Sequence, residues 1–181
     1  MTARKIKEGY PYTKNAIARL VESFPPPAKL LDVVTRDGYA IHLLKKHGYE
    51  LFGTDIDDEY VNFCKNRGYN VLLDDFSDTQ IEEKFDIVYS SHVIEHCLYP
   101  LDFLKSCEKV LKKDGVAFLY FPIERKRGDK KHDGYMKHRA FFWDLDDFRK
   151  IVEMSNLKEE QLFVTRTWRS HTEALFVGRK V

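Results

Sequence analysis

Residues able to do chemistry occur at four points along this chain, each at or just after the end of a run of apolar residues. Three of these points carry the carboxylates Asp32, Asp55 and Asp75, and the fourth is the segment 92–96 (HVIEH). Carboxylates accept hydrogen bonds from hydroxyl, amino and ammonium groups. Histidine takes up or releases a proton near neutral pH. The four points together indicate a site that binds a polar ligand and moves a proton.

The segment 92–96 reads H-x-x-E-H, which has two interpretations. On a continuous helix, this pattern binds zinc through its histidines in a metal-dependent hydrolase. Here it directly follows the apolar run 85–90, so a turn after a strand is favoured and the hydrolase is a remote alternative. In a turn, Glu95 and His96 would form hydrogen bonds that fix the backbone. A divalent ion at Glu95 and His96 is the open alternative, and no metal ligand is assigned. His92, nearest the strand end, is the candidate catalytic base.

The elements that must position these groups follow a repeated order of apolar run, acidic end, amphipathic stretch and glycine. Strands are expected at 29–34, 50–56, 70–73, 85–90 and 116–121, with a C-terminal hairpin from 161–168 and 172–177. Apolar strands that alternate with helices form a mainly parallel sheet covered on both faces. We therefore expect an α/β, doubly wound, Rossmann-like sheet of seven strands, ending in an antiparallel hairpin. Ligands of such sheets bind at the carboxyl ends of the strands.

Composition sets the limits of the function. A chain of 181 residues is expected to form one domain (1–181), with 1–27 as N-terminal helix and lead-in. Its net charge of +1 is too small for the basic field of a general nucleic-acid binder. Three cysteines without a C-x-x-C pair favour a reducing, cytoplasmic setting. Neither a secretory leader nor a run of about 18 apolar residues occurs, so no membrane partner is expected.

A basic segment follows the fifth expected strand. Residues 123–139 hold seven lysines and arginines against three acids, a net +4, which leaves −3 for the remaining chain. We expect residues 123–140 to form a loop at the substrate mouth, where Arg125, Lys126 and Arg127 would bind an anionic substrate. A solvated loop kept soluble by its charge is the equally open alternative.

Five segments, taken in order and spacing, resemble the class I S-adenosylmethionine (SAM)-dependent methyltransferases. They are 30–33 (LLDV), 52–57 (FGTDID), 73–76 (LDDF), 85–96 (FDIVYSSHVIEH) and 111–122 (LKKDGVAFLYFP). The resemblance implies SAM as cofactor and methyl transfer to an O or N acceptor of small or medium size, an anionic one included. A small-molecule substrate is expected, nucleic acid and protein substrates stay open, and the oligomeric state is not predicted.

The resemblance also implies roles for individual residues. Asp55, which follows Asp32 by 23 residues, would accept both ribose hydroxyls. Ile56 would pack on the adenine, Asp75 would accept from its amino group and the Phe76 N–H would meet a ring nitrogen. Asp32, Gly38 and Ser90 are also expected to contact the cofactor, and Tyr10 and Tyr12 would close over it. His96 is expected to contact the substrate. Strand-end aspartates are also common cap or turn residues, which is the alternative for each acid.

The chain departs from the family in its first loop. Where the family has three alternating glycines, this sequence has Val34, Arg36 and Gly38. Glycine tolerates positive φ and leaves room for a ligand, so we expect Val34 and Arg36 to adopt other dihedrals or to point elsewhere. Arg36 would either fill part of the cofactor pocket or pair with the methionine carboxylate. The loop keeps a non-catalytic, methyltransferase-fold binding or scaffold protein as the main alternative, and it lacks the G-x-G-x-x-G of a nicotinamide dehydrogenase.

Overall fold

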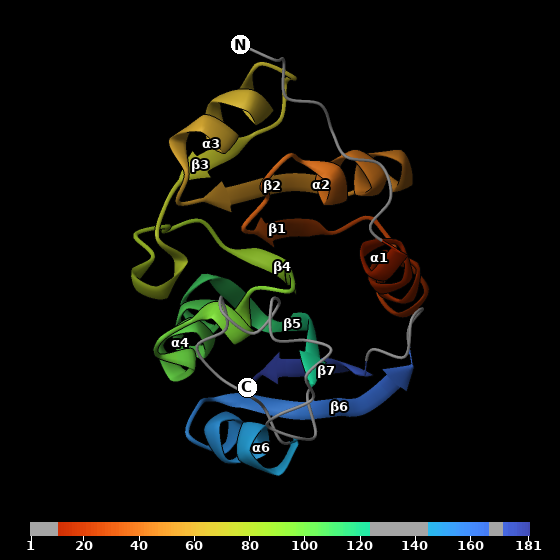
Figure 1. Ribbon diagram of the computed structural model, residues 1–181, viewed down its shortest axis with the longest axis vertical. Helices are drawn as coiled ribbons and strands as arrows, with labels where there is room; N and C mark the ends of the chain where they lie inside the picture. The colour runs from red at the N-terminus through yellow and green to blue at the C-terminus, as the bar shows by residue number, and fades with distance from the viewer. Residues whose placement is uncertain (1–10, 124–144, 167–171) are drawn as a thin grey trace, which may run out of the picture.

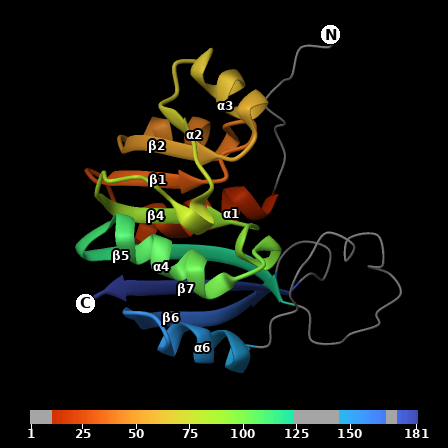
Figure 2. The same cartoon turned by 90° about the vertical axis from the view of Figure 1, so that its left-hand side faces the viewer.

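Seven strands form one sheet in the computed structural model, which describes residues 11–123, 145–166 and 172–181. The strands are β1 (Lys29–Val33), β2 (Glu50–Asp55), β3 (Val71–Leu73), β4 (Phe85–Ser91), β5 (Leu111–Ile123), β6 (Leu157–Arg166) and β7 (Thr172–Lys180). Their order across the sheet is β3-β2-β1-β4-β5-β7-β6, as Figures 1 and 2 show from two sides. The first five strands run parallel, and β7 runs antiparallel to both β5 and β6. The predicted doubly wound sheet with its C-terminal antiparallel hairpin is confirmed.

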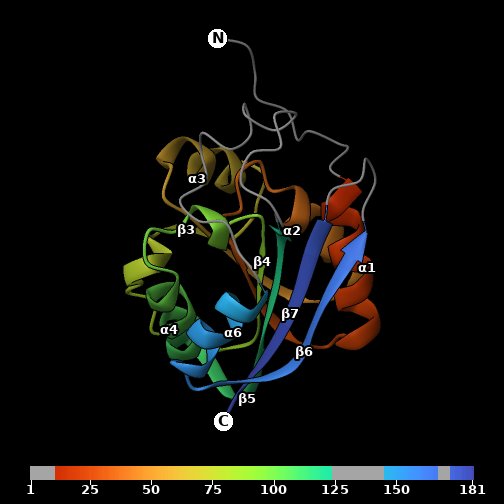
Figure 3. The same cartoon turned by 60° about the horizontal axis from the view of Figure 1, so that its bottom comes forward.

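Helices cover both faces of this sheet. The helices are α1 (Pro11–Ser23), α2 (Tyr39–Leu44), α3 (Asp58–Lys65), α4 (Pro100–Val110) and α6 (Leu145–Glu153), with short 3₁₀ turns at Lys45–His47, Phe76–Asp78 and Ile94–His96. Figure 3 shows α1 on one side of the sheet and α4 and α6 on the other. One core cluster lies under α4 and α6 and a second under α1 and α2, so each face has its own apolar layer. No helix of the described ranges is both long and apolar enough to cross a membrane.

The helix boundaries follow from capping residues that the sequence shows. Asp57 accepts a hydrogen bond from the Glu59 N–H and begins α3. Pro100 occupies the first turn of α4, where no N–H partner is needed. Gly48, at φ 95°, ends the turn after α2 in the left-handed region, as its position in the sequence predicts.

Two strands begin earlier than the apolar pattern predicts. β5 begins at Leu111 rather than Val116, because Leu111 already pairs with Phe85 of β4, ahead of a register shift and of the polar residues that break the apolar pattern. β6 begins at Leu157 rather than Gln161. It is an edge strand, so its first polar residues face solvent and break the apolar pattern.

Gly53 in β2 allows the loop after β1 to pack closely against the sheet. A Cβ atom at this position would overlap the hydroxyl of Thr35 and approach Ile41 Cδ1 to 2.9 Å. The Thr35 hydroxyl itself donates to the carbonyl of Asp32 at 3.0 Å. The absence of a side chain at Gly53 therefore supports the fold next to the site described below.

We expect Gly53→Ala to lower the free energy of unfolding by about 2 kcal/mol, because the added methyl overpacks this contact. Gly68→Ala is the matched control: Gly68 has φ 74° but no atom within 4 Å of an added Cβ, so only backbone strain of about 1 kcal/mol is expected. Urea denaturation of both variants measures the difference. Equal losses in the two variants would contradict the packing role of Gly53.

Candidate active site

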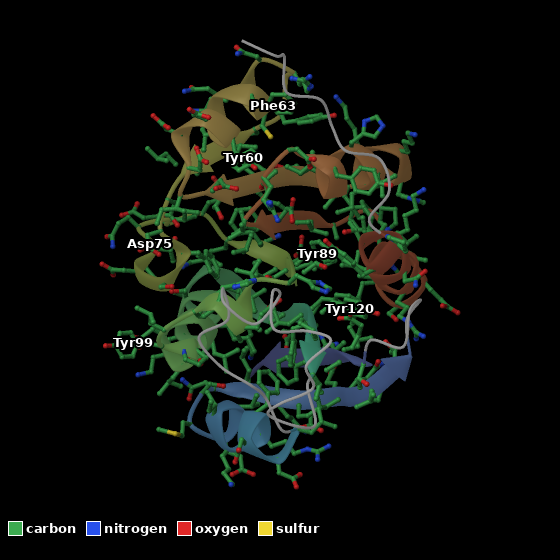
Figure 4. All side chains as sticks on the ribbon, in the orientation of Figure 1. Tyr60, Phe63, Asp75, Tyr89, Tyr99 and Tyr120 are labelled. Atoms are coloured by element: carbon green, nitrogen blue, oxygen red, sulfur yellow. The ribbon has the colours of Figure 1, made fainter. Side chains whose placement is uncertain are left out.

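A cavity of about 240 Å³ opens at the carboxyl ends of β1 and β4. The strand order reverses between these two strands, which is where doubly wound sheets bind ligands. The walls come from α1, the loop after β1, the start of α2 and the end of β4, and they include Tyr12, Asp32, Arg36, Tyr89, Ser91 and His92. In Figure 4, Tyr89 lies on the α1 side of the sheet, whereas Asp75 lies on the opposite side of the view.

Asp32 is a buried carboxylate in the wall of this cavity, with 3% of its surface exposed. Its Oδ2 atom accepts no hydrogen bond from the described residues. Burial, and next the negative charge of Asp55, raise the pKa of Asp32 well above its usual value. A buried carboxylate oxygen without a donor is costly, and a ligand ammonium or N–H group would satisfy it.

The loop after β1 keeps the backbone of a glycine-rich loop without the glycines. Val34 has φ 61° and Arg36 has φ 51°, so of the two alternatives expected for these residues the first, dihedrals other than those of glycine, is wrong. Two hydrogen bonds hold the loop against β2: the Thr35 N–H donates to the Thr54 carbonyl at 2.8 Å, and the Arg36 N–H donates to Asp55 Oδ2 at 2.7 Å. These bonds offset a strain of about 1–2 kcal/mol per left-handed residue. The Arg36 side chain is exposed and lines the cavity.

The end of this loop is closely packed. Gly38 has φ 77°, and a Cβ there would lie 3.0 Å from Tyr69 Cε2 and 3.1 Å from Cys64 Sγ, so glycine is needed for both conformation and space. The Cys64 thiol donates to the Arg36 carbonyl at 3.3 Å. Burial raises the pKa of Cys64 to about 12, which keeps the thiol protonated and able to donate.

Asp55 ends β2 with 3% of its surface exposed. Its Oδ2 accepts from the Arg36 N–H, and its Oδ1 accepts from the Asp57 N–H at 3.0 Å. Each carboxylate oxygen accepts more than one hydrogen bond, so both keep capacity for two hydroxyl groups of a ligand. The position predicted to bind ribose is therefore preorganised by two backbone donors.

The residues predicted to surround adenine lie beyond this cavity. Ile56 is 66% exposed, although its side chain is large and apolar. Leu73, for which no adenine contact was predicted, is also 59% exposed. Asp75 is exposed and its carboxylate accepts from the Ser77 N–H at 3.1 Å, so it caps the 3₁₀ turn Phe76–Asp78. Phe76 is buried, and its ring centroid lies 5.2 Å from that of Phe103. Its backbone is therefore the group available to a ligand. Contacts of these residues with adenine stay predictions.

His92 follows β4 and turns back onto the α1 side of the sheet. Its φ of 60° interrupts the strand alternation, while its N–H still donates to the Tyr120 carbonyl at 2.8 Å. The ring lies 4.0 Å from the Tyr12 ring, centroid to centroid. Its Nδ1 is 3.3 Å from Ser91 Oγ, and its Nε2 is 3.2 Å from Glu173 Oε2. The predicted base thus lines the cavity with both ring nitrogens next to polar groups.

Residues 92–96 do not form the helix that the zinc motif requires. After the left-handed His92, only Ile94–His96 forms a 3₁₀ turn, in which Glu95 is buried and His96 is exposed. His96 Nε2 is 3.7 Å from Glu95 Oε1, and His96 does not line the cavity. Within the ranges 11–123, 145–166 and 172–181, no three metal-ligating side chains come together.

Several residues in or beside the cavity were not predicted from the sequence. Ser90 is buried and lies outside the cavity lining, whereas its neighbours Tyr89 and Ser91 point to the α1 side and line it. Glu173 is also new; the signal was an acid at the start of the otherwise apolar run 172–177. Arg125, Lys126, Arg127 and Tyr10 lie outside the described residues, so their positions stay predictions.

Comparisons with known proteins agree with this arrangement. Residues 31–119 match the family model described as a methyltransferase domain. The ubiquinone biosynthesis O-methyltransferase of Actinobacillus pleuropneumoniae serotype 7 (strain AP76) is 31% identical over 102 residues, which cover 50% of this chain and 44% of that protein. The mitochondrial ubiquinone biosynthesis O-methyltransferase of Bos taurus is 27% identical over 125 residues, 60% of this chain and 34% of that protein. The chain thus spans less than half the length of these relatives.

Solved structures show the same fold. A TehB-like SAM-dependent methyltransferase from Corynebacterium glutamicum has a TM-score of 0.71 and 24% identity, covering 92% of this chain and 88% of that one. Phosphoethanolamine N-methyltransferase 2 of Haemonchus contortus, in complex with phosphomonomethylethanolamine and S-adenosylhomocysteine, has a TM-score of 0.78 and 13% identity, covering 92% and 52%. The sheet order and the site at its switch point define the class I methyltransferase fold. Residues 31–119 match the methyltransferase-domain model, and the predicted resemblance is confirmed.

The raised pKa of Asp32 predicts how stability changes with pH. The folded state holds this proton more tightly than the unfolded state, so the stabilisation is full below the ordinary aspartate range and is lost as the pH rises toward the raised pKa. Asp32→Asn removes this loss. Without ligand, we expect the melting temperature of the variant to rise relative to that of the wild type between about pH 4.5 and pH 8.

Differential scanning fluorimetry across this pH range makes the comparison. Glu82→Gln, at an exposed carboxylate before β4, is the matched control and should follow the wild type. A pH dependence of Asp32→Asn parallel to that of the wild type would show that the buried carboxyl titrates in its ordinary range.

Proposed function

We propose that this protein transfers a methyl group from SAM to an oxygen or nitrogen atom of a small or medium-sized acceptor. The observation that carries the proposal is the pair of buried carboxylates at the ends of β1 and β2, beside a loop with the backbone of a glycine-rich loop. Asp32 presents an oxygen without a donor, and Asp55 presents a carboxylate held by two backbone N–H groups. Free cysteines agree with a cytoplasmic setting, which we include in the proposal.

The residues present fit the groups of SAM. Its ammonium would satisfy Asp32 Oδ2, in a carboxyl group whose pKa is raised by burial and next by the negative charge of Asp55. Its carboxylate would pair with Arg36 at the cavity wall. Its ribose hydroxyls would donate to Asp55, and the exposed apolar side chains of Ile56 and Leu73 would cover the adenine. Asp75 and the Phe76 N–H would bind the polar edge of the ring.

The acceptor side of the site is formed by His92 and its neighbours. When bound, SAM supplies an electrophilic methyl group, so the chain has to hold the acceptor in line and take its proton. His92 is the candidate base because its ring lines the cavity. Tyr12 packs on that ring and limits its movement. Stacking and hydrogen bonding thus fix the base before the acceptor binds.

Two observations bear on the class of acceptor. The relatives named ubiquinone biosynthesis O-methyltransferase favour an oxygen acceptor on a small molecule. The basic residues Arg125, Lys126 and Arg127, together with His96, favour an anionic one. Val34 and Arg36 favour the second candidate, a binding protein of this fold without SAM, whereas their left-handed backbone, the region that glycine tolerates, supports the first.

Binding of S-adenosylhomocysteine measured by calorimetry tests the proposal. We expect Asp55→Ala to weaken binding by about 100-fold, because two hydrogen bonds to a charged group are lost. Asp58→Ala, at an exposed acid three residues later, should bind as the wild type does. Since Asp55 also holds the Arg36 and Asp57 N–H groups, the melting temperature of the unliganded variant must be recorded as well. No heat and no thermal shift with wild type at millimolar ligand would favour the scaffold protein instead.

A further inference from the structure

Glu173 is a buried acid that the proposed function does not yet use. It is the second residue of β7 and has 3% of its surface exposed. Because β7 runs antiparallel to β5, its first residues lie at the carboxyl edge of the parallel strands, and Glu173 is paired with Pro122 near the end of β5. The topology therefore brings a carboxylate from the last strand to the same edge as His92.

The carboxylate of Glu173 is directed at His92. Its Oε2 lies 3.2 Å from His92 Nε2 and is buried without an assigned hydrogen bond from the described residues. Tyr120 does not take this place, because its hydroxyl is bonded to Thr165 Oγ1 at 3.0 Å. The charge of Glu173 nevertheless contributes, after burial, to raising the pKa of Tyr120.

This distance fixes where a proton must lie. A carboxylate oxygen and an unprotonated imidazole nitrogen are both acceptors, so they do not approach to 3.2 Å in a buried place without a proton between them. Imidazole is ordinarily more basic than a carboxylate, so the proton belongs to Nε2 of His92. In the neutral ring Nδ1 is then the unprotonated nitrogen, 3.3 Å from Ser91 Oγ in the cavity wall.

We propose that Glu173 is the positioning residue of His92: it accepts the Nε2–H, fixes the neutral ring in that tautomer and leaves Nδ1 as the atom that takes the acceptor's proton. The inference rests on the proposed function, which makes His92 the base. It places the methyl acceptor on the Ser91 side of the ring. It also limits the acceptor to groups that carry a removable proton, O–H or N–H.

The proton transfer balances without a further reactant. As the acceptor atom bonds to the methyl carbon, the carbon–sulfur bond breaks and its electron pair goes to sulfur. The acceptor's proton passes to Nδ1, either directly or by way of the Ser91 hydroxyl, which gives up its own proton to Nδ1 and takes the acceptor's. The resulting imidazolium is stabilised by Glu173, whose carboxylate lies beside Nε2. Solvent then removes the proton and restores the neutral ring.

Long-range ¹H–¹⁵N correlation spectra of the histidine rings test this tautomer directly and need no substrate. The His92 signals are assigned by their absence from His92→Gln. We expect neutral His92 in the wild type to carry its proton on Nε2, with a proton resonance shifted downfield by the bond to a carboxylate. In Glu173→Gln that downfield resonance should be lost, while affinity for S-adenosylhomocysteine stays within about threefold, because Glu173 does not line the cavity.

Glu159→Gln is the matched control. It makes the same change at a carboxylate of β6 that pairs with Arg149 of α6, and it should leave the His92 spectrum unchanged. Protonation of His92 on Nδ1 in the wild type, or a Glu173→Gln spectrum identical to that of the wild type, would overturn the inference. The wild-type spectrum decides even where Glu173→Gln does not fold. A wild type with the Nε2–H tautomer but no binding of S-adenosylhomocysteine would leave the His92–Glu173 pair standing and refute the proposed function.

Discussion

The hydrogen bond from the Arg36 N–H to the Asp55 carboxylate joins the two loops on which the rest of the site depends. The first loop follows β1 and shapes the cavity, and the second follows β2 and begins α3. Asp55 holds both loops, because its Oδ1 atom also accepts a hydrogen bond from the Asp57 N–H in the second loop. Asp55 is buried, so breaking its bond with the Arg36 N–H would leave its Oδ2 atom without that donor and would release the loop strain. The same bond also keeps the Asp55 carboxylate close enough for its charge to act on Asp32, which makes a cationic ligand more favourable there.

Backbone strain is concentrated around the cavity. Four residues other than glycine have positive φ in the described part of the chain: Val34, Arg36, His92 and Asp114. The first three all line the cavity. A β-branched residue such as Val34 rarely adopts this conformation, so the surrounding hydrogen bonds must hold it. Because the strain collects where side chains and backbone must meet a ligand, it supports a functional interpretation of the departure from glycine at Val34 and Arg36.

The fold could be predicted from the sequence because each βα unit carries its own local signals. Asp57, Gly48 and Pro100 mark helix ends through interactions of one or two residues, and the apolar runs mark buried strands. The dihedrals of Val34 and Arg36 could not be predicted in this way. Residue preference opposes the left-handed region at both positions, and the bonds that override it come from Thr54 and Asp55, about twenty residues away.

Glu173 could not be predicted by the rule that site residues follow each strand. That rule holds for parallel strands, whose ends lie at the ligand-binding edge. An antiparallel strand contributes to the same edge with the residues at its start, and β7 enters the sheet there with Glu173. Because His92 turns to the α1 side through its positive φ, its ring meets this acid instead of the opposite face of the sheet. The antiparallel hairpin thus supplies a polar group that a sheet of parallel strands alone would have to take from a loop.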